Sequence, residues 1–192
     1  MNDRKAASSK PRRPRKVTPQ SLRNAALYYL QRYASSSANL RAVLTRRIRR
    51  AERDQEIDHD AAAGWIEKIV ADFESSGLLD DKTYADARIQ TMFRQGRSRR
   101  TMMLDLRKKG VAAEVVDSAV GSLSQETPAP DRVAAIRYAR RRRLGPFRAA
   151  DRAEHRERDL AAIARAGFDY ETARYVIDAD DPEGLEEDPL QA

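Results

Sequence analysis

Throughout the body of this chain, apolar residues recur every three or four positions, which is the spacing of one face of an α-helix. The first such stripe is Leu22, Ala26, Tyr29 and Tyr33. No convincing strand pattern occurs, and glycine, proline or short polar clusters divide the periodicity into nine segments. The pattern therefore predicts an all-α protein of nine helices. Tyr29 and Tyr33 are expected in the core, whereas Tyr28 lies off the stripe and is expected on the surface.

Residues suited to helix ends stand at most of these boundaries. Thr18 precedes Pro19, which combines a side-chain cap with a first-turn proline. Other candidate N-caps are Ser36, Asp80 or Asp81, Ser98 and Asp169. Gly110 stands where a helix end requires a left-handed residue, and Val111 follows as its apolar partner. The charged stretch 49–60 is compatible with either a longer second helix or a loop.

The nine helices fall into three similar groups. The stretch 107–120, RKKGVAAEVVDSAV, aligns with 165–178, RAGFDYETARYVID, so that Gly110 matches Gly167. The first group shares the helix pattern but lacks this glycine and carries the 49–60 connection instead. We therefore predict three tandem three-helix repeats. Their predicted bounds are residues 18–79, 80–124 and 129–178.

Charge is distributed unevenly along the chain. Residues 1–17 carry +6 and read as a disordered basic arm, and 178–192 carry −7, so that 179–192 reads as a disordered acidic tail. The body between them retains about +8, which favours a polyanion or an acidic protein surface as partner. With 35% charged and 6% aromatic residues the core is thin, which suits a row of exposed helices.

The sequence offers no recognisable chemistry. It has no cysteine, and it shows no phosphate-binding loop, no HExxH pattern and no acid/base arrangement of carboxylates. His59 and His155 stand alone in charged surroundings. We therefore expect no enzyme, no metal and no cofactor. No apolar run approaches the ~18 residues of a membrane span, and we expect a cytoplasmic protein.

Two basic segments are the candidate partner-binding surfaces. On the helix that follows Ser98, Met102, Met103 and Leu106 share one side. The opposite side carries Arg97, Arg100, Leu104, Arg107 and Lys108. The second segment is the run Arg140, Arg141, Arg142 and Arg143, which points in several directions around a helix. The helix after Gly110 has no Arg, Lys, Asn or Gln to read base edges, which disfavours a sequence-specific helix-turn-helix.

Residues 74–120 resemble the central repeat of the RecX family, regulatory proteins of the RecA recombinase. The pieces that carry the resemblance are Gly77-Leu78-Leu79-Asp80-Asp81, Tyr84-Ala85, Arg94-Gln95-Gly96 and Leu106-Arg107-Lys108-Lys109-Gly110-Val111. Residues 26–48 are similar to the first repeat of that family. The resemblance implies an elongated, curved row of repeats that lies in the groove of the RecA–DNA filament. It implies a monomer that inhibits the ATPase, strand-exchange and coprotease activities of RecA in recombination, DNA repair and the SOS response.

Two other functions remain open from the residues alone. The basic arm and body are compatible with a general nucleic-acid-binding protein, whose affinity would fall steeply with salt. They are equally compatible with a helical adapter for another acidic partner. For a RecA regulator we expect direct DNA contact to be weak and filament binding to dominate.

Overall fold

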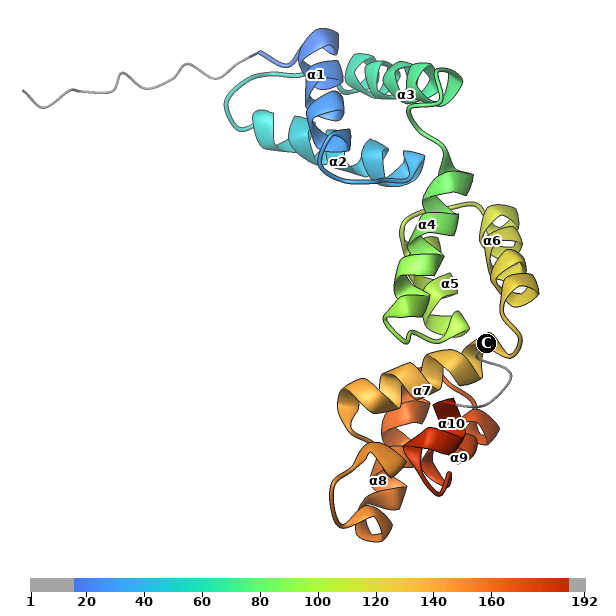
Figure 1. Cartoon of the computed structure of the whole chain (residues 1–192). Coiled ribbons are helices and arrows are strands. Elements are labelled where there is room, and N and C mark those ends of the chain that lie inside the picture. Colours follow the sequence, from blue (N-terminus) through green and yellow to red (C-terminus); the bar gives the residue numbers. More distant parts are fainter. Residues whose placement is uncertain (1–15, 187–192) are drawn as a thin grey trace, which may run out of the picture.

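The structure is a computed structural model, and it describes residues 16–186. Within that range the chain forms α-helices and one 3-10 turn and no strand, which confirms the all-α prediction (Figure 1). The elements are α1 (Pro19–Leu30), α2 (Ser37–Ala51), α3 (His59–Ser75), α4 (Asp81–Arg94), α5 (Arg99–Lys108), α6 (Ala113–Glu126), α7 (Pro130–Arg142), η1 (Gly145–Phe147), α8 (Arg152–Arg165), α9 (Tyr170–Ile177) and α10 (Pro182–Glu186).

The helices are grouped in threes, as tandem repeats require. The first repeat comprises α1 to α3, the second α4 to α6, and the third α7 to α9 with η1. Figure 1 shows the three groups following one another in an elongated, bowed row. In a row of this kind each repeat packs only against its neighbours, and much of the helix surface stays exposed.

The apolar stripes build two separate cores. The first repeat has its own core, in which Leu22, Leu40 and Phe73 are almost fully buried. The second and third repeats share one continuous core that extends from Ala85 to Leu185. Both halves of the repeat alignment are buried as expected, including Val111 with Phe168, Val116 with Ala173, and Ala119 and Val120 with Val176 and Ile177.

The predicted residues at the helix ends are confirmed. The side chains of Thr18, Ser36, Asp80, Ser98 and Asp169 each accept a backbone N–H of the first helical turn. Gly110 has φ +71°, and the Val111 N–H donates to the carbonyl of Leu106 at 3.1 Å, so α5 ends in the expected left-handed turn. These signals depend on residues only a few positions apart, which is why the sequence predicts them well.

One open question about the helices is settled, and two predictions differ from the structure. The 49–60 stretch is divided, because α2 ends at Ala51 and Asp58 caps α3. Tyr33 is exposed instead of buried, since α1 ends at Leu30 before it. The acidic tail is not structureless throughout, because Pro182–Glu186 form α10 and the side chain of Leu185 is 2% exposed. Residues 1–15 of the predicted arm and 187–192 of the predicted tail lie outside the described residues.

The junction between the first and second repeats is made by polar groups and close backbone approach. The Ser36 hydroxyl donates to the carbonyl of Lys109, and the Ser37 N–H donates to the Asp81 carboxylate at 2.8 Å. A Cβ on Gly110 would lie closer than 3.0 Å to that of Ala38. The start of α2 is thus seated on the end of α5, and glycine permits that approach.

The junction between the second and third repeats has the same construction. The Ser98 hydroxyl donates to the carbonyl of Ala166 at 2.9 Å, and the Arg99 N–H donates to Asp131 at 2.8 Å. A Cβ on Gly167 would lie 2.6 Å from the Ser98 oxygen. Burial raises the pKa of Asp131 despite the bond from Arg99. The paired glycines found in the sequence therefore serve both as helix ends and as docking points for the preceding repeat.

A candidate basic surface across the second and third repeats

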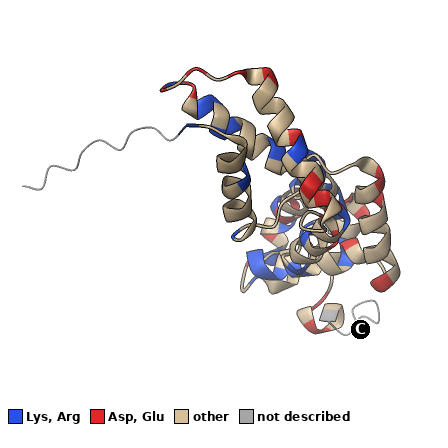
Figure 2. Cartoon of the chain, turned by 90° about the horizontal axis from the view of Figure 1, so that it is seen from above, with Lys and Arg blue, Asp and Glu red and all other residues tan. Residues whose placement is uncertain are grey.

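A hollow of about 600 Å³ lies beside the second junction, and most of its charged side chains are basic. We call it the junction hollow. Its walls are Arg97, Tyr138, Arg142, Leu144, Arg148, His155, Arg158, Asp159, Ala162, Arg165 and Ala166. Figure 2, which looks along the row, shows a compact group of Lys and Arg positions on one side of the stacked repeats.

The fold brings three separate segments to the junction hollow. Arg97 directly precedes the α5 cap, and the bond from Ser98 to Ala166 fixes it beside the end of α8. The end of α7 contributes Arg142. One face of α8 contributes His155, Arg158, Ala162 and Arg165, which are three or four residues apart. The hollow is therefore formed where the second repeat packs against the third.

Its single acidic side chain is already neutralised. The guanidinium of Arg148 donates to Asp159 at 2.7 and 3.2 Å, and the Gly145 N–H donates to the same carboxylate at 2.9 Å. Burial raises the pKa of Asp159, but the bonds from Arg148 and Gly145 outweigh it and hold this pKa below its usual value. Asp159 therefore remains ionised at neutral pH and compensates Arg148.

The remaining cations of the junction hollow are uncompensated. Among residues 16–186, no carboxylate forms an ion pair with Arg97, Arg142, Arg158 or Arg165. Guanidinium groups bind carboxylates and phosphates through paired N–H donors, and several of them in one hollow produce a strongly positive field. The arrangement is suited to an anionic partner.

The predicted run of four arginines divides as expected between different directions. Arg142 lines the junction hollow. Arg141 donates to the carbonyl of Gln95 and lies over the Tyr138 ring at 5.8 Å. Arg140 lies over Phe147 at 5.7 Å, and Arg143 ends α7 in the left-handed conformation. Only one of the four therefore contributes to the hollow, and their role in partner binding stays a prediction.

The other predicted segment, the basic face of α5, is also formed. Met102 and Leu106 are fully buried on one side of the helix, and Arg100, Leu104, Arg107 and Lys108 are exposed. Asp105, the one carboxylate of α5, is held by Arg88 at 2.9 and 3.1 Å. Arg97 joins this face to the junction hollow, whereas the other α5 residues continue it toward the first repeat.

Sequence reasoning missed Arg148, Arg158 and Arg165 as members of this surface. The eighth helix reads as a solvated charged segment when it is considered alone. A signal was available in the spacing of Arg158 and Arg165, which are seven residues apart and so share a face of α8. Nothing in the sequence indicates that this face of α8 lies close to Arg97.

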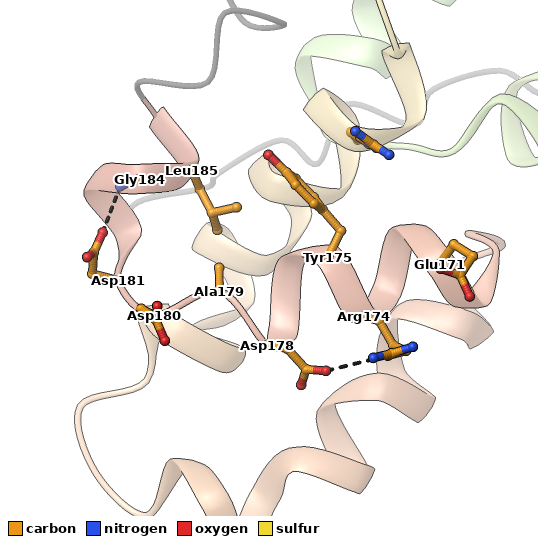
Figure 3. A pocket seen from close by; sticks show the side chains of 10 residues that line it. Glu171, Arg174, Tyr175, Asp178, Ala179, Asp180, Asp181, Gly184 and Leu185 are labelled. Carbon is orange, nitrogen blue, oxygen red and sulfur yellow. Dashed lines mark hydrogen bonds and ion pairs between the residues drawn. The ribbon is translucent and has the colours of Figure 1, made fainter.

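A second hollow, of about 580 Å³, lies where α10 meets α7 and α9 and is lined largely by carboxylates (Figure 3). Two of its four carboxylates, Asp178 and Asp181, are held by groups of the chain, and the Gly184 N–H donates to Asp181 at 2.7 Å. Asp178 accepts two bonds from Arg156 at 2.7 and 2.8 Å, which lower its pKa, and it also lies 3.6 Å from Arg174. In the described part of the chain, no cluster of His, Asp or Glu is arranged to hold a metal ion, and no helix is long and apolar enough to cross a membrane.

The comparisons with known proteins agree on one family. A model of the second three-helix domain of RecX matches residues 80–120. The regulatory protein RecX of Myxococcus xanthus is 45% identical over 171 residues, which cover 88% of this chain and 90% of that protein. The chain belongs to the RecX family. The RecX protein of Agrobacterium fabrum is 34% identical over 81% of this chain and 80% of its own length.

Solved RecX structures have the same fold. A crystal structure of a regulatory protein RecX matches 84% of this chain and 72% of its own, with a TM-score of 0.60 at 20% identity. RecX from Lactobacillus salivarius matches 88% of this chain and 96% of its own, with a TM-score of 0.59 at 19% identity. The row of helical repeats is thus a RecX fold, and this chain is a regulatory protein by family.

Proposed function

We propose that this protein inhibits the RecA recombinase by lying in the groove of the RecA–DNA filament and contacting it through the junction hollow and the basic face of α5. It acts by binding and performs no chemistry. Membership of the RecX family supports the choice of partner. The observation that carries the proposal is the group of four uncompensated arginines, Arg97, Arg142, Arg158 and Arg165, at the joint of two repeats.

The shape and the charge of the row suit a filament. An elongated row can follow a groove that a compact domain of this size would only touch at one point. Uncompensated guanidinium groups need an acidic protein surface or phosphates as partners, and a filament of protein on DNA offers both. Because the arginines come from three segments, a rigid junction fixes their spacing before the partner binds, which reduces the entropy lost on binding.

The test is the ATPase rate of RecA on single-stranded DNA, titrated with this protein, together with binding to bare DNA. The site variant is Arg142→Glu with Arg158→Glu. The control is Arg49→Glu with Arg53→Glu, since these exposed arginines carry the same charge and line none of the hollows described. We expect the site variant to require on the order of tenfold more protein than the parent for half-inhibition, which corresponds to the loss of roughly one charge-assisted hydrogen bond. The control variant should require about as much protein as the parent.

Three results contradict the proposal. Equal losses in both variants would mean that only net charge matters. Inhibition only at concentrations that saturate bare DNA would make the protein a competitor for nucleic acid. Absence of inhibition by the folded parent protein would leave an adapter for another acidic partner.

A further inference from the structure

A second basic groove lies at the other end of the row, between α1 and α2 of the first repeat. Its volume is about 830 Å³, and we call it the α1–α2 groove. Its charged side chains are five basic residues and one acidic residue, namely Lys16, Arg32, Arg46, Arg47, Arg50 and Asp54. Within residues 16–186, Arg46, Arg47 and Arg50 have no ion-pair partner. The groove is therefore positively charged independently of the junction hollow.

Exposed aromatic rings distinguish this groove from the junction hollow. Tyr28 and Tyr33 line it with 56% and 58% of their surface exposed, although large aromatic side chains are usually buried. The guanidinium of Arg32 stacks on the Tyr28 ring at 3.9 Å. Tyr33 rests against Tyr29 with ring centroids 5.2 Å apart. Arg32 and Tyr29 thus contact the two rings, and more than half of the surface of each tyrosine stays exposed.

The core of the first repeat does not need these side chains. That core is built from the residues of α1, α2 and α3 that are almost fully buried, and neither tyrosine is among them. Arg46 and Arg50 are four residues apart on α2, so they share one helix face, and Arg47 lies next to it. Two aromatic residues on one wall and three cations on the other thus face the groove, and none of them belongs to the core of the first repeat.

The basic arm of this chain is a poor occupant for the groove. The arm enters at Lys16, and the Val17 N–H donates to Gln55 at 3.2 Å, so the chain approaches along the groove wall. Residues 1–17 carry +6, and like charges repel. The occupant must instead be anionic, and flat rings in it would match the exposed tyrosines.

We propose that the α1–α2 groove binds single-stranded nucleic acid, with bases stacked on Tyr28 and Tyr33 and phosphates contacted by Arg46, Arg47 and Arg50. A cationic groove that tracks the backbone, combined with aromatic platforms, is the usual construction of a single-strand site. A duplex keeps its base faces stacked inside and could use only the cations. An acidic peptide would likewise use the cations and leave the tyrosines without a function.

The test measures binding of two ligands to the full chain by fluorescence anisotropy, with no recombinase present. The ligands are an oligothymidylate of about 15 nucleotides and an abasic oligomer of the same length and charge. The stacking variant is Tyr28→Ala with Tyr33→Ala, and its control is Tyr170→Ala, an equally exposed tyrosine of α9 outside the groove. We expect the stacking variant to lose on the order of tenfold or more in affinity for oligothymidylate and to bind the abasic oligomer unchanged.

The cationic wall is tested on the same helix. Arg46→Ala with Arg50→Ala should weaken binding of both ligands and reduce the slope of log affinity against log salt by about 0.7 for each phosphate that the variant no longer binds. Arg49→Ala removes one positive charge from α2 outside the groove and should change binding by less than about twofold.

Three outcomes overturn the inference: no binding of the oligothymidylate at low salt, equal binding of the abasic oligomer, or an unchanged affinity of the stacking variant. A polyglutamate peptide that binds in a tyrosine-dependent manner would instead identify an acidic protein segment as the ligand. Because RecA is absent, these results are independent of the ATPase test. Either proposal can therefore fail while the other stands.

Discussion

Replacing Gly110 by alanine tests whether the first junction fixes the arrangement of the row. Gly110 has φ +71°, and the added Cβ would lie closer than 3.0 Å to the Cβ of Ala38, whereas carbon atoms in normal contact are about 3.5–4.0 Å apart. Alanine therefore adds two costs. The left-handed backbone costs about 1–2 kcal/mol, and the overlap costs about 1–3 kcal/mol unless the first repeat moves away.

Gly77 separates these two costs. It ends α3 with the same φ of +71°, but an added Cβ there meets nothing within 4 Å. Gly77→Ala should therefore cost only the backbone strain, about 1–2 kcal/mol, and leave the row unchanged. The difference between the two variants is the cost of the overlap with Ala38.

Ala38→Gly should relieve the overlap. This substitution alone costs up to about 1 kcal/mol, because glycine is a poor helix residue. Combined with Gly110→Ala it should recover about 1–3 kcal/mol relative to the sum of the single variants, a coupling that urea unfolding can measure. Small-angle scattering would show whether the first repeat has moved. An identical loss for Gly110→Ala and Gly77→Ala, or no coupling to position 38, would refute this account of the junction.

Three further substitutions have expected outcomes that urea unfolding can measure. Asp159→Asn, which leaves Arg148 without its buried partner, should cost about 3 kcal/mol, whereas Asp72→Asn, at a 44% exposed ion pair, should cost less than about 1 kcal/mol. Folding lowers the pKa of Asp159, so the ionised Asp159 carboxylate stabilises the fold above the unfolded pKa of 3.8, and this stabilisation is lost as pH falls through the lower folded pKa. The Asp159→Asn variant should lack this acid-dependent loss of stability. An equal loss in both proteins would contradict the role given to Asp159. Gly96→Ala should cost at least about 1 kcal/mol more than Gly77→Ala, because its Cβ would lie 2.7 Å from the Tyr138 backbone nitrogen; equal costs would show that α7 moves aside freely.

The fold was accessible from the sequence because its signals are local. A cap such as Ser98 or Gly110 is fixed by residues within about four positions, and a helical stripe by residues within about two turns. The short α10 was not accessible, because a single apolar residue, Leu185, has no periodicity. It is buried only through contact with the shared core of the second and third repeats.

The candidate surface was accessible only in part for a related reason. Arg97 and Arg142 are predicted from basic segments, whereas no residue of α8 is among the predicted contacts, although Arg165 belongs to the same hollow. Charge runs reveal where cations are dense in the sequence. They do not reveal which helix faces converge, and this convergence depends on the contact of Ser98 with Ala166, two residues that lie 68 positions apart.

The first and third repeats each lack one of the two residues that build the junctions. Each junction joins an outgoing serine cap to an incoming left-handed glycine, Ser36 with Gly110 and Ser98 with Gly167. At the corresponding place in the first repeat, α2 ends at Ala51 and its C-cap, Glu52, has φ −58°, so no left-handed glycine stands there.

The third repeat lacks the serine cap of the other two. The N-cap of α8 is Asp151, which has φ +55° and no side-chain cap bond, where the other two repeats place a serine. The two positions that lack the serine or the glycine therefore lie in the first and the third repeat, and the second repeat carries both residues. Three repeats need two junctions, and residues 16–186 carry two complete sets of serine and glycine. Asp151→Ser or Glu52→Gly would supply half of a junction whose counterpart is absent from residues 16–186, so neither change should lengthen or reshape the row.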